Sequence, residues 1–167
     1  MDYETVSASD FGAALRGIGL NLVCRDVRAT AAFLQAAFDM GIHRLSADFA
    51  IVTYGNGRYL STQAQAELEA RGIKTRVVDL RWLAPLPADA LIEATRGCKN
   101  VLIVDECRTT GSQSEALMAL FAERSDIPAA RIAAGDCFIA TGPAYAATLP
   151  SKDSILAAAL DLVGAKA

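Results

Sequence analysis

The side chains best suited to catalysis are few and scattered in this sequence. Its four cysteines, at positions 24, 98, 107 and 137, are not paired at a Cys-x-x-Cys spacing, and its one histidine is His43. A zinc site or a disulfide framework needs such pairs or clusters, so we expect neither. We expect the cysteines to be buried apolar residues and His43 to be a packing or surface residue. The sequence therefore predicts no catalytic residue and no metal ligand.

A site built from backbone N–H groups is indicated by one run of residues that precedes a predicted helix, namely Thr109, Thr110, Gly111 and Ser112. Free backbone N–H groups at the start of a helix can bind an anion or a carboxylate. The same residue types also cap helices, with Thr110 or Ser112 as the capping residue. We favour capping and keep an anion site at these four residues as the alternative.

Other polar residues at the ends of predicted strands suit an interface better than a reaction. Asp105 and Glu106 are adjacent, so on a strand they face opposite sides and cannot act as a facing pair of carboxylates. Arg81 and Trp82 follow another strand, and both residue types are favoured interface anchors. The alternative for Trp82 is packing beneath the turn at 85–87. The predicted interface residues are Arg81, Trp82, Asp105, Glu106 and Arg108.

The elements that position these residues alternate between short apolar strands and longer helical patterns. Strands are predicted over 51–54, 75–80, 101–104 and 130–134, and a helical pattern follows each of the first three; Ser151 caps the last helix, and 138–150 is mainly loop. Strand–helix–strand alternation predicts a three-layer α/β/α domain with a mostly parallel sheet. Residues 1–48 are read as an N-terminal β-α appendage, with a strand at 19–24 and a helix at 29–38 capped by Asp26, and residues 49–167 as the α/β domain.

Composition excludes several classes of protein. The chain has 167 residues, of which 53% are hydrophobic and 21% charged, a balance that supports a packed core. The net charge is −3, without the basic stripe that follows nucleic-acid phosphates. No apolar run reaches the roughly 20 residues of a membrane span, and the acidic N-terminus does not read as a secretory signal. We therefore expect a cytoplasmic protein that binds neither nucleic acid nor membrane.

Three segments resemble the transketolase C-terminal domain family, and are closest to the β subunit of the E1 component of 2-oxo acid dehydrogenases. They are Ile51-Val52-Thr53-Tyr54-Gly55-Asn56-Gly57, the turn within 77–87 that reads Asp-Leu-Arg-Trp-Leu-Ala-Pro-Leu, and 101–111 with its Val-Asp-Glu and Thr-Gly. The resemblance implies a complete enzyme that binds thiamine diphosphate and Mg²⁺ between two other domains and decarboxylates a 2-oxo acid. It implies that the C-terminal domain builds the homodimer and contacts an E1 α-type subunit and the acyltransferase core.

The same resemblance implies that this chain is not catalytic alone. Too few residues precede Phe49 for the pyrimidine-binding domain, and the pyrophosphate motif Gly-Asp-Gly followed by Asn-Asn is absent. We therefore expect no cofactor to be bound by this chain by itself. Which 2-oxo acid the complete enzyme would use does not follow from the sequence, because the family's substrate pocket lies in the other domains.

The N-terminal segment 19–34 resembles the opening strand and helix of a glyoxalase/bleomycin-resistance module. Metal-dependent members of that family place a histidine or glutamate on this strand, where this sequence has Asn21. The alternative functions are therefore a glyoxalase-type small-molecule or metal-binding protein and a stand-alone α/β domain that binds an anion.

Overall fold

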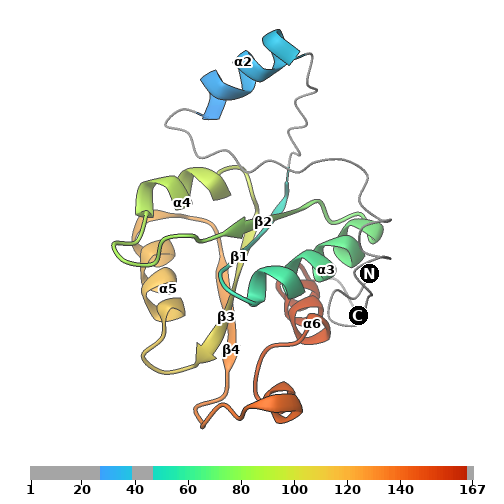
Figure 1. The fold of residues 1–167 in the computed structure, drawn as a ribbon, viewed down its shortest axis with the longest axis vertical. Helices are drawn as coiled ribbons and strands as arrows, with labels where there is room; N and C mark the ends of the chain where they lie inside the picture. Colours follow the sequence, from blue (N-terminus) through green and yellow to red (C-terminus); the bar gives the residue numbers. More distant parts are fainter. Residues whose placement is uncertain (1–26, 39–46, 165–167) are drawn as a thin grey trace. The chain divides into compact units, whose positions relative to one another are not determined.

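The computed structural model describes residues 27–38 and 47–164 (Figure 1). The chain divides into two units, residues 1–44 and 45–167, and each is described by itself. In the first unit the described element is helix α2 (Val27–Phe38), which confirms the helix predicted near 29–38. The predicted strand at 19–24, the cap at Asp26 and His43 lie outside the described residues.

The second unit contains a four-stranded parallel sheet in the order β2-β1-β3-β4. Its strands are β1 (Phe49–Thr53), β2 (Thr75–Asp79), β3 (Asn100–Arg108) and β4 (Ala129–Ala134). Its helices are α3 (Gly57–Ala70), α4 (Ala88–Thr95), α5 (Gln113–Arg124), the 3₁₀ helix η1 (Gly142–Ala147) and α6 (Lys152–Leu162). This arrangement confirms the predicted α/β fold.

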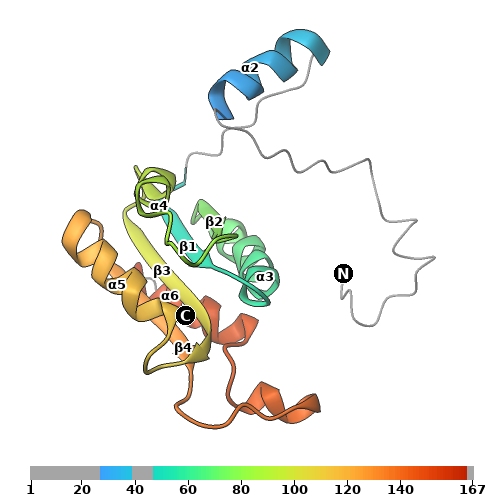
Figure 2. The same cartoon turned by 60° about the vertical axis from the view of Figure 1, so that its left-hand side comes forward.

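Helices cover both faces of the sheet, α4 and α5 on one side and α3 and α6 on the other (Figures 1 and 2). Alternate residues of the central strands feed two separate cores: Val52 and Ile103 pack toward α4 and α5, whereas Ile51 and Leu102 pack toward α3 and α6. All five residues of β1 are buried. A strand buried on both faces needs the continuous apolar run that made β1 and β3 recognisable in the sequence.

The ends of the helices follow from local chemistry. Gly72 adopts a φ of +80° just after α3, the left-handed conformation that glycine allows at no steric cost. Ser151 and Ser154 form a reciprocal capping box at the start of α6, in which each hydroxyl accepts a hydrogen bond from the other's backbone N–H. The cap at Ser151 was predicted from the sequence.

The structure corrects two details of the predicted elements. Strand β3 does not end at Asp105 and Glu106 but continues to Arg108, with a register shift against β4 between Val104 and Arg108. The segment 138–150, expected to be mainly loop, contains η1.

Candidate functional site

The carboxyl ends of β1 and β3 form the natural site of this fold. The chain leaves β1 through α3 toward β2 on one side, whereas β3 and β4 lie on the other side of β1. Loops that diverge in this way from neighbouring parallel strands open a crevice at their carboxyl ends, where ligands bind in many α/β proteins. The segments 54–57 and 105–112 meet at this edge, where the Tyr54 hydroxyl donates to Asp105 and the Asn56 N–H donates to Glu106.

A buried carboxylate, that of Asp105, fills one side of this edge. Its side chain is fully buried and accepts hydrogen bonds from the Tyr54 hydroxyl, from the backbone N–H of Cys107 at 2.7 Å and from the backbone N–H of Ser114 at 2.9 Å. The last of these bonds caps α5 from inside the protein. Asp105 therefore joins the ends of β1 and β3 to the start of α5.

This environment holds Asp105 in its charged form. Burial alone would raise the pKa of the carboxyl, but the hydrogen bonds from Tyr54, Cys107, Ser112 and Ser114 outweigh burial and lower the pKa below its ordinary value. Burial, followed by the bond to Asp105, raises the pKa of Tyr54 far above its ordinary value. The pair therefore consists of a carboxylate acceptor and a phenol donor across the physiological pH range, which suits a structural bond.

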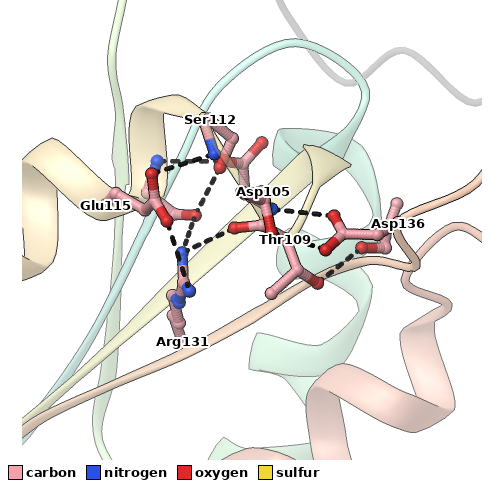
Figure 3. Close-up of polar contacts among 10 residues, drawn as sticks. Asp105, Thr109, Ser112, Glu115, Arg131 and Asp136 are labelled. Atoms are coloured by element: carbon pink, nitrogen blue, oxygen red, sulfur yellow. Dashed lines mark hydrogen bonds and ion pairs between the residues drawn. The ribbon is translucent and has the colours of Figure 1, made fainter.

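The loop 109–112 contains the predicted anion site, and the protein's own carboxylates already occupy it (Figure 3). Asp136 accepts from the backbone N–H of Thr110 at 2.8 Å and from its hydroxyl at 2.5 Å, and Glu115 accepts from the backbone N–H of Gly111 at 2.9 Å. Ser112 takes the N-cap position of α5 but makes no side-chain capping bond. The N–H groups of Thr110 and Gly111 are thus bonded to carboxylates. The carboxylate that caps α5 is that of Asp105, which accepts from the N–H of Ser114.

Arg131 of β4 holds this loop in place through hydrogen bonds (Figure 3). Its guanidinium donates to the backbone carbonyl of Thr109 at 3.0 Å and to the hydroxyl of Ser114 at 3.2 Å, and lies 4.0 Å from the carboxylate of Glu115. The hydroxyl of Thr109 donates to the carbonyl of Ala134 at 2.8 Å. The loop is therefore held on both sides by β4 and the residues that follow it.

We expect inorganic phosphate at millimolar concentration to leave the melting temperature of the chain unchanged. A phosphate at 109–112 would have to displace the carboxylates of Asp136 and Glu115, and the buried charge of Asp105 would repel it. Thermal unfolding with phosphate, against sodium chloride at equal ionic strength, checks this. A rise in melting temperature that saturates with phosphate and disappears in Thr110→Ala would restore the anion-binding interpretation.

The predicted interface residues separate into exposed and buried ones. Trp82 is 63% exposed, so its predicted alternative, packing beneath the turn at 85–87, is wrong. Arg81 is also exposed and donates from Nε to the Asp79 carboxylate at 2.5 Å, and Arg108 is exposed at the end of β3. Asp105, in contrast, lies inside the unit. Its contribution to any interface is to hold the strand ends in place.

Glu106 faces the opposite side of β3 from Asp105, as the alternation predicts. Its carboxylate accepts from the backbone N–H of Asn56 at the start of α3, 3.1 Å away. It also lines a hollow whose other walls include Leu60, Val104 and Leu149. The hollow is thus largely apolar, with one acid at its edge.

The described residues offer no fit for a catalytic metal or for thiamine diphosphate with its Mg²⁺. Within 27–38 and 47–164 no three histidine, cysteine, aspartate or glutamate side chains gather in a way that could hold a metal ion. The amides most suited to a pyrophosphate, at 110 and 111, are bonded to carboxylates. In the same ranges no helix is long and apolar enough to cross a membrane.

The cysteines differ from the prediction. Cys98 is buried, as expected, but Cys107 and Cys137 are exposed free thiols, so the expectation that the cysteines are buried is wrong for these two. Cys107 is the penultimate residue of β3, and Cys137 follows β4 at the same carboxyl edge of the sheet. Cys24 lies outside the described residues.

Four residues of the site were missed in the sequence: Tyr54, Glu115, Arg131 and Asp136. Tyr54 and Asp105 are 51 positions apart, and Thr110 and Asp136 are 26 apart. Glu115 alone carried a local signal, because a carboxylate in the first turn of a helix suits the positive end of the helix dipole. The other three residues reach the site only because β1 and β4 pair with β3.

The geometry defines an α/β domain whose strand-end loops are closed by internal carboxylates and whose surface exposes Trp82 and an apolar hollow. The model of the transketolase C-terminal domain matches residues 40–155, and the chain belongs to this family.

Relatives agree with this assignment. The chain is 30% identical to the pyruvate dehydrogenase E1 component subunit beta of Bacillus subtilis (strain 168) over 119 residues, which cover 69% of this chain and 37% of that protein. It is 35% identical to the 2-oxoisovalerate dehydrogenase subunit beta of the same organism over 99 residues, covering 57% of this chain and 30% of that protein. The chain therefore spans about a third of the length of these relatives.

A solved structure described as a split-gene transketolase, an inactive beta4 tetramer, superposes with a TM-score of 0.64 and 26% identity over 73% of this chain and 41% of that one. The 2-oxoglutarate:ferredoxin oxidoreductase from Magnetococcus marinus, at 14% identity and a TM-score of 0.54, shares the fold alone. These comparisons confirm the resemblance to E1 β subunits. They do not support the resemblance of the segment 19–34 to a glyoxalase module, and the functions based on it are not favoured.

Proposed function

We propose that this chain acts as the C-terminal assembly domain of a thiamine-diphosphate-dependent 2-oxo acid dehydrogenase of the E1 β type and is not catalytic by itself. The observation that carries the proposal is the match of residues 40–155 to the transketolase C-terminal domain. Among the described residues, no cluster of histidine, cysteine, aspartate and glutamate side chains could hold a metal ion. Thiamine diphosphate and Mg²⁺ would be held by other domains or chains, and the reaction would belong to the completed enzyme.

The surface that supports an assembly role is the segment between β2 and α4. Trp82 is 63% exposed and Leu83 36%, and they follow the exposed Arg81. A tryptophan exposed to this extent on an otherwise packed domain gains free energy when a partner covers it, since aromatic and arginine anchors dominate binding energy at interfaces. We assign this segment to contact with an E1 α-type subunit. The homodimer, the acyltransferase core and the cytoplasmic location stay predictions.

The test is binding of the full chain to a purified E1 α subunit of a bacterial 2-oxo acid dehydrogenase. Calorimetry measures the affinity, and light scattering measures the mass of the complex and of the chain alone. We expect binding, and we expect Trp82→Ala to weaken it by about thirty-fold because an interface tryptophan anchor is worth about 2 kcal/mol or more. Phe33→Ala, which removes a comparably exposed ring from α2, serves as the matched control. A chain that stays monomeric at high concentration and does not bind E1 α would refute the assembly role.

A further inference from the structure

Two arginines share one carboxylate at the carboxyl ends of β1 and β2. Nε of Arg81 donates to Oδ2 of Asp79 at 2.5 Å, and Nε of Arg58 lies 3.3 Å from the same oxygen. The side chain of Asp79 is 17% exposed, whereas those of Arg58 and Arg81 are 55% and 74% exposed. The three side chains together therefore carry one net positive charge at the surface of the second unit.

The sheet brings this cluster together. Thr53, the last residue of β1, pairs with Asp79, the last residue of β2, and the N–H of Leu80 donates to the carbonyl of Thr53 at 2.8 Å. Arg58 lies in the first turn of α3, which follows β1, and Arg81 comes two residues after the end of β2. The two guanidinium groups therefore come from neighbouring strand ends that the fold holds in register.

Each arginine uses only part of its hydrogen-bonding capacity in these contacts. Among the residues that the structure describes, the Nη groups of Arg58 and Arg81 have no hydrogen-bond or ion-pair partner. A guanidinium presents five N–H donors in a planar fork that matches the geometry of a carboxylate. The cluster can therefore bind a second carboxylate, which would also neutralise its net charge.

A partner that covers Trp82 makes this second carboxylate necessary. Residues 81–85 are all exposed, so a surface that covers Trp82 also removes water from the adjacent Arg81. A charged group removed from water is costly unless it is paired, and Asp79 already serves two cations. A small free anion would leave the arginines in water, where an ion pair contributes little. These charges therefore favour an acidic protein surface as the occupant.

We propose that the partner of this surface places an aspartate or glutamate side chain between Arg58 and Arg81, beside the apolar contact that covers Trp82. This inference rests on the assembly role proposed above and adds the chemistry by which the partner is recognised. The tryptophan supplies apolar contact area, and the arginines select a partner that has a carboxylate next to its apolar patch, since charge complementarity contributes specificity at interfaces.

The experiment measures binding of the full chain to the purified E1 α subunit by calorimetry at low and at high sodium chloride concentration. At low salt, Arg58→Gln and Arg81→Gln should each weaken binding by about ten-fold, as expected for the loss of a charge-assisted hydrogen bond. Circular dichroism confirms that each variant is folded.

Arg96→Gln is the matched control. The Arg96 side chain is 75% exposed and pairs with Glu93 at 2.8 Å. It follows α4 and precedes β3, so it lies at the opposite edge of the sheet from the cluster. Its replacement removes the same charge from the chain and should leave the affinity unchanged.

Salt separates the contribution of the arginines from that of the tryptophan. High salt should weaken the complexes of the wild-type chain and of Trp82→Ala, because it screens the proposed ion pairs, and should have a smaller effect on the double variant Arg58→Gln with Arg81→Gln. If Arg58→Gln and Arg81→Gln bind as tightly as Arg96→Gln while Trp82→Ala still weakens binding, the acidic contact is overturned and the assembly role stands.

Two further outcomes would assign the arginines differently. Succinate, a small dicarboxylate, is titrated into the chain alone, and binding that disappears in Arg81→Gln would give the cluster to a small acid and overturn the protein contact. A chain that does not bind E1 α at any salt concentration would remove the assembly role and this inference together.

Discussion

Replacing Asp105 with asparagine is expected to lower the free energy of unfolding by about 2–4 kcal/mol, because a buried carboxylate with three donors loses its charge and one acceptor. Oδ1 accepts from Tyr54 and Cys107, and Oδ2 accepts from the backbone N–H of Ser114. An asparagine can present its carbonyl oxygen to only one of these two sides. Its amide group then faces a donor, and a buried N–H is left without an acceptor.

Urea unfolding of the full chain measures this loss as a lower midpoint at an unchanged slope. Asp136→Asn is the matched control: Asp136 is an exposed carboxylate of the same network, and its amide analogue can still accept from the N–H of Thr110. We expect a much smaller change there, since exposed groups exchange their partners with water. Equal losses for the two variants would mean that the burial of Asp105 is not what makes it important.

Acid titration tests whether the negative charge of Asp105 stabilises the folded chain. Because the pKa of Asp105 is lower in the folded chain than the ordinary value of about 3.9, its contribution to stability is complete above about pH 5 and is lost as the pH falls through 3.9 toward the lowered pKa. The wild-type chain should therefore lose stability in this range faster than Asp105→Asn. A constant difference between the two from neutral pH into acid would contradict a charged Asp105.

The fold was predictable because its signals are local. A strand buried on both faces must be apolar throughout, as 101–104 is, and Gly72 and Ser151 mark helix ends by conformational and capping preferences that act within a few residues. The end of β3 was mispredicted for a related reason. Asp105 reads as the end of a buried strand because burying a charge is costly, and the sequence does not show that Tyr54 and two backbone amides compensate that cost.

The sequence predicts where the site lies, but not whether its backbone amides are free to bind a ligand. Parallel strands bring 54–57 and 105–112 to one edge, and that follows from the alternation of elements. Whether the amides of 109–112 are free for a ligand depends on Asp136, which reaches Thr110 only because β4 pairs with β3. A helix start with free amides and one that is closed by carboxylates have the same local sequence. The difference between a binding site and a structural joint therefore lies in tertiary contacts.

Replacing Gly57 with alanine is expected to destabilise the chain by about 1–3 kcal/mol, because the first turn of α3 lies against β1 with no room for a Cβ atom. A Cβ at Gly57 would lie 2.4 Å from Oγ1 of Thr53 and 3.6 Å from Val104. Thr53 is fully buried on a strand paired on both sides, so it has little freedom to move. The better helix propensity of alanine, at most about 1 kcal/mol, offsets only part of the clash.

Two further substitutions at Thr53 identify the clash as the cause. Among the described groups Oγ1 of Thr53 has no hydrogen-bond partner, so removing it breaks no bond. Thr53→Ala deletes this atom and should recover most of the loss in the double variant with Gly57→Ala, whereas Thr53→Val keeps a methyl group of similar size in its place and should not. Residues in contact show such coupling in unfolding free energy, and distant residues do not. If both double variants were equally unstable, α3 would be losing stability for a reason other than its contact with β1. That contact would then not be what requires glycine at position 57.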